Sequence, residues 1–522
     1  MTGETERAVE MAAGMMTTPV TAADWLVVAP IIIPLIFGAV LLMFRHETRW
    51  QGVVALVGLG ALVGAEAALL ARVLENGPLA MTMGSWLPPF GISFTVDALG
   101  ALFALGSGGV AFICAIFALR DIGASGRRYG FYPFLMLMMT GVSGAFLTGD
   151  IFNLYVWFEV FVISSFGLLI LGSEKAQLDG ATKYAILNLV ATTLFLVATA
   201  YLYGIFGTLN MADIARKASG LRETAPLMTL AALYLLAFGM KAAAFPVNFW
   251  LPASYHTPRI VVGALFGGLL TKIGIYSLLR TLVMLFPVER AAMSELIGLV
   301  AIATMLLGAL GALAQSDTRR MFGFLVISGV GVMLAGLALG SETGVAGAIF
   351  YALHSMLIMT ALYLLAGMMR ELGGSFSLHE LSGLYRASPL LSGIALVLAA
   401  AVAGLPPASG LWPKVMLVKA ALDADAWWLT GAILLSGFLT MIAVGRMFLL
   451  AYWREPAGGR SPAARAEPAG LFLGHGALIA LSLPIVLLGL FPEPVIRVAN
   501  LAAAGLLNSS GYIGAVFPAG GG

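Results

Sequence analysis

Fourteen apolar runs, separated by short polar connections, constrain this chain more than any other feature of its sequence. A helix needs about 20 predominantly apolar residues to cross a bilayer, and most of the runs reach that length. The chain of 522 residues is 60% hydrophobic and only 10% charged, whereas soluble globular chains carry about 25% charged residues. We therefore predict an all-α integral membrane protein.

The runs place about fourteen transmembrane helices along the chain. The seventh and twelfth are long and are interrupted by prolines and glycines, so we expect both helices to be broken. The predicted spans lie near 25–44, 50–73, 97–119, 130–147, 149–171, 181–206, 226–252, 259–284, 292–314, 320–340, 344–369, 387–424, 427–453 and 471–491.

Two segments between the runs are predicted not to cross the membrane. Residues 76–96 carry turn-forming and β-branched residues, which indicate a hairpin-like loop. Residues 455–470 are rich in Pro, Gly and Ala and are typical of a flexible connection.

Basic residues in the loops predict the orientation of the chain. Fifteen lysines and arginines fall in one set of loops and five in the alternate set. Because cytoplasmic loops are enriched in Lys and Arg, the first loop is expected in the cytoplasm and both termini outside. An even number of spans follows from the same alternation.

Four charged residues fall deep inside predicted spans. Glu159, Lys241 and Lys272 are central in the fifth, seventh and eighth spans, and Lys414 follows the break in the twelfth. Each such charge costs about 2.5–3.5 kcal/mol on insertion scales, so we expect a functional role in proton transfer. The alternatives are a buried Glu–Lys pair that only fixes helix packing, and a lysine that extends to the membrane surface.

Prolines mark the two breaks. Pro246 follows Lys241, whereas Pro406, Pro407 and Pro413 precede Lys414. Broken helices at corresponding places in two halves indicate a transporter site. Lys241 is expected near the C-terminal end of a half-helix, where the dipole favours positive charge. Lys414 is expected at the start of one, with Pro413 at the first helical position, where the dipole disfavours that charge.

Two histidines lie near these charges. His354 is central in the eleventh span, and because histidine titrates near physiological pH it is a candidate proton relay. A hydrogen-bonded core histidine is the alternative. His256, at the seventh-span break, is interpreted as a loop-end packing or capping residue, and Asp150 as a helix cap.

Several function classes are excluded by absent signals. Cys114 is the only cysteine, so a disulfide within the chain and a cysteine metal site are excluded. No phosphate-binding loop, zinc-protease motif or nucleophile triad is present, and no basic cluster suits nucleic acid. We expect neither a cofactor nor an enzyme active site in this chain.

The motifs resemble a known family. TGDIFNLYVWFEV, FGMKAAAFPVNFWLPASYHTP, GALFGGLLTKIGIYSLLR and GLPPASGLWPK are similar to the antiporter-like proton-translocating subunits shared by respiratory complex I and Mrp-type multisubunit antiporters. Within that family the D subunits of the Mrp type are the most similar. The resemblance implies two inverted five-helix repeats and a lateral series in which Glu159 pairs with Lys241. Lys272, His354 and Lys414 would continue that series.

The resemblance also implies a division of the chain. The expected parts are an external segment 1–24, helices 25–129 with an external loop 74–96, a first repeat 130–284, a second repeat 292–453, and a linker, last helix and tail over 454–522. Some relatives carry a lysine a few residues after the histidine of the eleventh span, where this chain has Met359. The link between the repeats is therefore expected to depend on His354 and water.

The resemblance implies a proton-translocating subunit of a heteromeric Na⁺/H⁺ antiporter in the bacterial cytoplasmic membrane. Its expected partners are the other subunits, Na⁺, H⁺ and membrane lipid. One alternative is a proton-pumping subunit of a complex I-type or membrane hydrogenase complex. Another is a scaffold that organises partner subunits without transporting ions.

Overall fold

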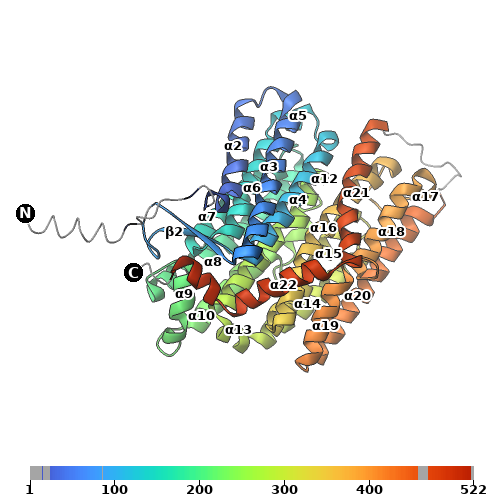
Figure 1. Ribbon diagram of the computed structural model, residues 1–522. Coiled ribbons are helices and arrows are strands. Elements are labelled where there is room, and N and C mark those ends of the chain that lie inside the picture. The colour runs from blue at the N-terminus through green and yellow to red at the C-terminus, as the bar shows by residue number, and fades with distance from the viewer. Residues whose placement is uncertain (1–14, 16–20, 22–23, 85, 456–467, 519–522) are drawn as a thin grey trace, which may run out of the picture.

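The computed structural model describes residues 15, 21, 24–84, 86–455 and 468–518. Within this part the chain is a bundle of tilted helices with one small hairpin at its side (Figure 1). The predicted segment 1–24 and the flexible connection 455–470 fall largely outside the described residues.

Ten of the described helices are long and apolar enough to cross a membrane. They are α3 (Thr48–Asn76), α4 (Ala98–Asp121), α7 (Ile151–Leu169), α8 (Lys175–Phe206), α12 (Ile260–Leu278) with η2 (Leu279–Leu285), α14 (Ser294–Ala314), α15 (Thr318–Leu339), α16 (Glu342–Gly373), α20 (Trp427–Phe448) with η3 (Leu449–Trp453), and α21 (Pro468–Leu490).

Four shorter apolar helices complete the set, and each of the fourteen predicted runs overlaps with one of these long or short helices. The shorter ones are α2 (Ala29–Met43), α6 (Phe131–Leu147), α10 (Leu227–Ala242) and α18 (Pro389–Ala403). The remaining elements are η1 (Asp24–Val27), α5 (Ala124–Arg128), α9 (Met211–Leu221), α11 (Trp250–Ser254), α13 (Pro287–Ala292), α17 (Leu384–Ala387), α19 (Leu411–Asp423), α22 (Glu493–Leu507) and α23 (Ser510–Val516).

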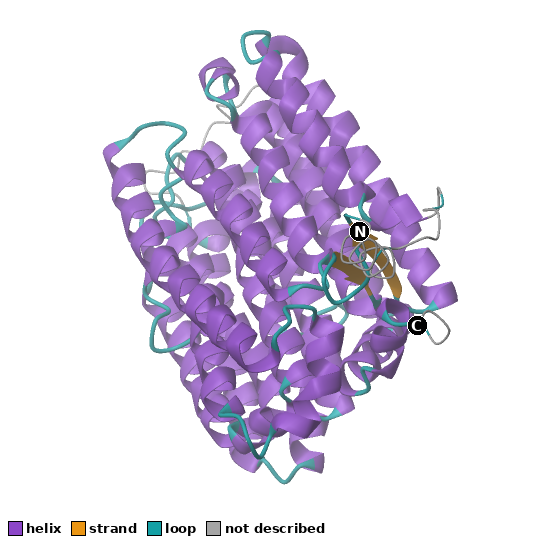
Figure 2. Cartoon of the chain, turned by 90° about the vertical axis from the view of Figure 1, so that its left-hand side faces the viewer, coloured by secondary structure: helices purple, strands orange, loops and turns teal. Residues whose placement is uncertain are grey.

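The predicted hairpin between the second and third spans is present. Strands β1 (Leu79–Met83) and β2 (Ile92–Val96) pair antiparallel, with Leu79 opposite Val96 and Met83 opposite Ile92. The hairpin lies on the side of the bundle where both ends of the described chain are found (Figure 2).

The seventh and twelfth predicted spans are broken. Helix α10 ends at Ala242, followed by Ala243 at φ 60°, and the chain resumes as the short helix α11. Helix α18 ends at Ala403, followed by Gly404 at φ 87°, and resumes as α19. A cis X–Pro peptide lies in each break, at Phe245–Pro246 and Pro406–Pro407.

Other features recur in the two halves of the chain. Asp150 caps α7 and bridges to Asn210, while Asp317 caps α15 and bridges to Ser377. Helices α12 and α20, each following a broken helix, both continue into a π-helix. These correspondences are consistent with the two predicted repeats.

The most deeply buried helices form the middle of the bundle. The apolar window of α12 and η2 is completely buried, and those of α15 and α16 are 89% and 94% buried. Helix α16 packs against both α12 and α15. The titratable residues Lys272, Arg280 and His354 in the middle of these helices are therefore shielded from lipid.

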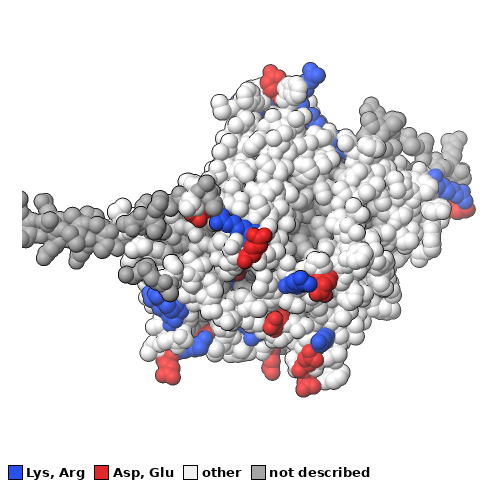
Figure 3. All heavy atoms as spheres, in the orientation of Figure 1, with Lys and Arg blue, Asp and Glu red and all other residues white. Residues whose placement is uncertain are grey.

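The C-terminal part crosses one end of the bundle. Helix α22 runs almost perpendicular to the long helices (Figure 1) and packs against α16, α4 and η2, whereas α23 packs against α9 and the hairpin. On the face drawn in Figure 3, charged side chains lie at the top, at the right-hand end and along the lower edge, with a few small groups across the middle of the face. A broad area between them is almost free of charge, as a membrane protein requires.

Candidate functional site

Five helices carry the five residues predicted to transfer protons. Glu159 lies on α7, Lys241 on α10, Lys272 on α12, His354 on α16 and Lys414 on α19. Within the described part of the chain, no hydrogen bond or ion pair joins any two of these five side chains. The three lysines and His354 instead contact neutral groups.

Lys241 occupies the last turn of α10, as predicted. Its side chain is buried, and Nζ donates to Asn188 Oδ1 of α8 at 3.0 Å. The amide of Asn188 is oriented by its own Nδ2, which donates to the Tyr184 carbonyl at 2.8 Å. The Phe158 ring lies 5.5 Å from the ammonium. The sequence reasoning missed Asn188, although it is a polar residue inside a predicted span.

Glu159 lies on α7 at the edge of an exposed apolar stripe. Phe152, Val156 and Ile163, which are seven and three residues before it and four after it, are 44%, 38% and 61% exposed. The Glu159 carboxylate is close enough to Lys241 to act on its charge. The predicted Glu159–Lys241 pair is not a direct ion pair in this structure, because the ammonium is turned towards Asn188.

Lys272 is completely buried on α12. Its Nζ donates to the Gly267 carbonyl of the same helix at 2.6 Å. Gly267 lies against the Tyr363 ring of α16, which would be 2.8 Å from a Cβ at that position. No carboxylate forms an ion pair with Lys272 among the described residues, so the ammonium has only a backbone oxygen as partner.

His354 projects from α16 towards the second helix break. Its Nδ1 lies 2.8 Å from Ser409 Oγ, and a Cβ on Gly410 would be 3.0 Å from Nε2. The imidazole is within electrostatic range of both Lys272 and Lys414. Interaction with both lysines suits a relay, while the bond to Ser409 also fits the alternative of a hydrogen-bonded core histidine.

The prediction that a helix dipole disfavours the charge of Lys414 is wrong. Helix α19 begins at Leu411, so Pro413 is its third residue and not its first. The Lys414 side chain extends to the other half-helix, where Nζ donates to the carbonyls of Ala403 at 2.8 Å and Val402 at 3.3 Å. Those carbonyls form the C-terminal end of α18, whose dipole favours positive charge.

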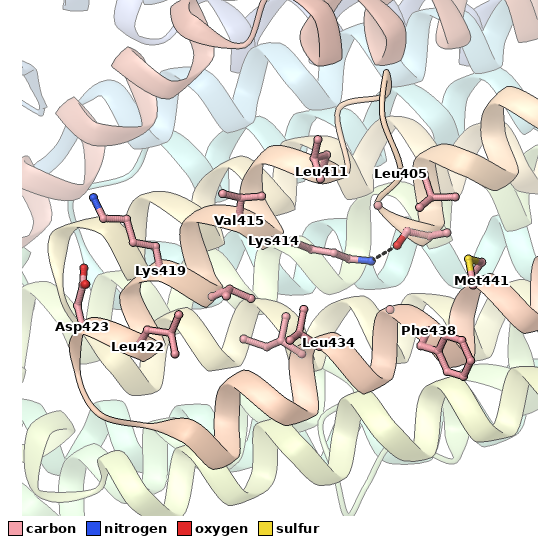
Figure 4. Close-up of a pocket in the computed structure, with 15 residues that line it drawn as sticks. Leu405, Leu411, Lys414, Val415, Lys419, Leu422, Asp423, Leu434, Phe438 and Met441 are labelled. Atoms are coloured by element: carbon pink, nitrogen blue, oxygen red, sulfur yellow. Dashed lines mark hydrogen bonds between the residues drawn. The ribbon is translucent and has the colours of Figure 1, made fainter.

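A groove with a volume of ≈ 510 Å³ lies between α19 and α20, and Lys414 lines it. Its walls are mainly apolar, and Lys419 and Asp423 line its other end. Figure 4 shows Lys414 and Lys419 extending in opposite directions along the groove. The ammonium of Lys414 is thus reached from the surface of the chain.

Side chains satisfy backbone groups at the first break. Helix α10 ends before Pro246, as predicted, and the Trp250 indole donates to the Met240 carbonyl at 3.2 Å. The Phe245 amide donates to Thr304 Oγ1 of α14 at 3.0 Å. These bonds hold the broken backbone in place where a continuous helix would satisfy it internally.

The second break, which contains Pro406 and Pro407, is braced by α21. Ser409 N donates to the Ile485 carbonyl at 2.9 Å. The Trp412 indole donates to the Gly489 carbonyl at 2.7 Å. Helix α21 therefore fixes the segment that contacts His354.

His256 has a structural position that agrees with its interpretation as a loop-end residue. Its Nδ1 lies 2.8 Å from the Pro252 carbonyl, and Arg320 of α15 donates to Nε2 at 3.2 Å. Burial and the charge of Arg320 hold the pKa of His256 below its usual value. The neutral ring links the first half of the chain to the second.

Other buried charges were missed by the sequence reasoning. Arg280 of η2 is fully buried and forms an ion pair with Asp97, the cap of α4, with Nη1 2.6 Å from Oδ2. Glu66 of α3 is also fully buried. Both lie inside apolar runs, which is the signal that could have identified them. The described residues contain no cluster of three or more His, Cys, Asp or Glu that could hold a metal ion.

The fold and these buried residues define a membrane-embedded transport subunit of the antiporter-like class. Residues 148–440, more than half of the chain, match the family described as NADH:quinone oxidoreductase/Mrp antiporter. The chain belongs to this family, which confirms the resemblance seen in its motifs.

Within this family, the chain is similar to D subunits of Na⁺/H⁺ antiporters. The chain is 36% identical to the D subunit of the Na⁺/H⁺ antiporter of Alkalihalophilus pseudofirmus over 491 residues, which are 94% of this chain and 99% of the relative. It is 35% identical to the D subunit of the Bacillus subtilis antiporter over 490 residues, with the same coverage. These relatives are transport proteins, in agreement with the expectation that the chain is not an enzyme.

A solved structure supports the same assignment. A chain in the structure of the Mrp complex from Dietzia sp. DQ12-45-1b matches with a TM-score of 0.87 and 28% sequence identity. The match covers 95% of this chain and all of that one. The fold is thus that of a subunit found within a multisubunit membrane complex.

Proposed function

We propose that this chain is the D-type subunit of a multisubunit Na⁺/H⁺ antiporter and that it conducts protons. The names of its 36% and 35% identical relatives support the exchange of Na⁺ for H⁺. They favour this function over the complex I-type alternative.

The observation that carries the proposal is a series of buried or half-buried titratable side chains that, among the described residues, form no ion pair with one another. Lys241, Lys272 and Lys414 each donate to a neutral oxygen, from an amide or from the backbone. A lysine locked in a buried ion pair keeps its proton, whereas burial without a countercharge favours the neutral amine. These lysines can therefore take up and release protons.

The order of the residues supports lateral movement. Glu159 acts on Lys241, and His354 lies within electrostatic range of Lys272 and Lys414. We assign Glu159 the role of a switch, because moving its carboxylate changes the proton affinity of Lys241. His354 is the relay between the two halves of the chain, and Lys414 is the terminal site.

The two ends of the series support a role for partner subunits. Glu159 borders an exposed apolar stripe, and Lys414 lines a groove at the surface. Figure 1 places α7 and α8 on one side of the bundle and α19 and α20 on the other. A carboxylate facing lipid is costly, so we assign these faces to contacts with other subunits and with membrane lipid.

The proposal keeps the predicted division and orientation. Residues 130–284 and 292–453 are the two repeats, and the matched caps, breaks and π-helical ends support this division. The excess of basic residues in alternate loops supports external termini. The exchange would bring protons inward and move Na⁺ outward across the bacterial cytoplasmic membrane.

A vesicle experiment tests the function. Na⁺- and K⁺-dependent ΔpH is measured in vesicles containing the whole complex and in vesicles whose complex lacks this chain, without NADH or ferredoxin. The proposal predicts Na⁺-dependent ΔpH only with the complete complex. A requirement for an electron donor would instead support the oxidoreductase alternative. Normal antiport after Glu159→Ala and Lys241→Ala would support the scaffold alternative.

A further inference from the structure

Helix α3 carries an acid in the middle of its buried face. Ala55, Leu59, Leu62, Leu69 and Val73 follow one another at helical spacing and are 0–2% exposed. Glu66 lies in the same stripe, between Leu62 and Leu69, and is 0% exposed. The stripe packs against α2, α4 and α6. A leucine would fit the pattern, so the carboxyl group needs an explanation beyond packing.

Among the residues that the structure describes, the carboxyl group of Glu66 has one hydrogen-bond partner. Ser143 of α6 donates to Oε1 at 3.2 Å, and Oε2 is buried without a partner. Oε2 fits into a notch at Gly108 of α4, where any Cβ would be only 1.9 Å away. Helices α3, α4 and α6 therefore pack closely around this carboxyl group.

No cation neutralises Glu66 within the described part of the chain. Helix α2 has no titratable residue, and α6 has only Tyr132. The one titratable group in the middle of α4 is Cys114, since Asp97 caps its start and Arg120 and Asp121 end it. Those of α5 and η1 are Arg127, Arg128 and Asp24, and none forms an ion pair with Glu66.

The chemical surroundings of the Glu66 carboxyl group favour a proton over any other ligand. An ionised carboxylate without a countercharge is strongly disfavoured in a low-dielectric interior. One carboxyl group and one hydroxyl are too few oxygens for a hard metal cation. A protonated carboxyl group carries no net charge and can still accept the Ser143 hydrogen bond with Oε1.

We propose that Glu66 is a further proton-binding residue of the antiporter, separate from the series between Glu159 and Lys414. It lies ten residues before the end of α3 at Asn76, which is about 15 Å along the helix. That end is predicted to face outside, so Glu66 is placed to exchange protons with the outer half of the bundle. A role in transport rests on the proposed function, whereas the presence of the bound proton does not.

Infrared spectroscopy of the purified complex tests the bound proton. A protonated buried carboxyl group gives a C=O stretch that moves on exchange into D₂O. We expect this band in the wild-type protein at neutral pH and its loss in Glu66→Gln. The control is Glu75→Gln, at the exposed end of α3, which should keep the band. If Glu66→Gln fails to assemble, Ser143→Ala serves instead, because removing the hydroxyl should shift the band to higher frequency. A wild-type spectrum without the band, or one that neither variant changes, would overturn the proposal.

Antiport by the same variants tests the role in transport. Glu66→Gln should lower the rate of Na⁺-dependent ΔpH formation by about 100-fold, the lower range for loss of a positioned proton acceptor, or shift its pH profile. Glu75→Gln should retain the wild-type rate and pH profile. A band that disappears in Glu66→Gln with unchanged antiport would overturn the transport role and leave Glu66 as a structural acid. Antiport absent even from the wild-type complex would contradict the proposed function and not the bound proton.

Discussion

The ammonium of Lys241 donates to the side-chain oxygen of Asn188 at 3.0 Å, and not to the carboxylate of Glu159. A neutral partner stabilises the charged lysine less than a carboxylate would. The proton of Lys241 is therefore easier to release in this arrangement, and a movement of Glu159 towards it would bind the proton more tightly.

Replacing Asn188 should disturb proton transfer at Lys241. A hydrogen bond to a charged group contributes about 1.5–3 kcal/mol, so Asn188→Leu should weaken proton binding by Lys241 about 10- to 100-fold. We expect the pH profile of antiport to shift towards acidic pH. Thr193→Ala, an exposed position on the same helix, is the control. Identical profiles for both variants would show that Asn188 does not set the proton affinity.

The groove between α19 and α20 allows a comparison of two lysines. Lys414 contacts the carbonyl end of α18, whereas Lys419, five residues later, extends the other way. Lys414→Ala should lower Na⁺-dependent ΔpH by at least about 100-fold, and Lys419→Ala should keep most of it. Equal losses in the two variants would indicate that the groove serves assembly and not proton transfer.

The buried pair of Asp97 and Arg280 should stabilise the chain without transferring protons. Arg280 also donates to Tyr276 at 3.1 Å and lies 5.2 Å from the Tyr512 ring of α23. Removing one partner of a buried pair costs about 3–5 kcal/mol. Asp97→Ala should thus lower the unfolding temperature of the complex in detergent, and adding Arg280→Met should restore part of it. A double variant less stable than Asp97→Ala would contradict this.

Asp150 should make stability depend on pH. Burial raises the pKa of this helix cap from 3.8 to about 6, although the Asn153 amide opposes the shift. Because the folded state holds the proton more tightly, stability is present at low pH and falls as pH rises from 3.8 to about 6. A shift of roughly two units corresponds to at most about 3 kcal/mol.

The uncharged variant Asp150→Asn isolates this effect. Asparagine also caps helices, so the variant should melt like the wild type at pH 4 and at a higher temperature at pH 7. The measurement is the unfolding temperature of the purified complex across that range. A constant difference between the two proteins at every pH would contradict the assignment to Asp150.

The sequence predicted the helices and the buried lysines because both follow from local composition. A charge such as Lys272 within an apolar run is costly wherever the helix packs, and a break is encoded by Pro246 or by the Pro406–Pro407 pair. The contacts of the charges depend on tertiary packing. Lys241 and Asn188 are 53 residues apart, and the direction of Lys414 depends on how α19 folds back on α18.

Glu66 was missed for a different reason. Its position inside the predicted span 50–73 is a signal in the sequence, but which face of α3 is buried follows only from the packing of that helix. Pro413 was expected at the first position of its helix and lies at the third, because proline is accepted throughout the first turn. Both cases show that residue type alone does not set depth or register.

Proton conduction through this chain is tested most directly by Na⁺-dependent ΔpH in vesicles carrying the complex with Lys241→Ala, at matched amounts of every subunit. Lys183→Ala, at an exposed lysine of α8, is the control. We predict that Lys241→Ala abolishes the Na⁺-dependent ΔpH and that Lys183→Ala leaves it at the wild-type level. Wild-type ΔpH in the assembled Lys241→Ala complex would contradict proton transfer through this chain.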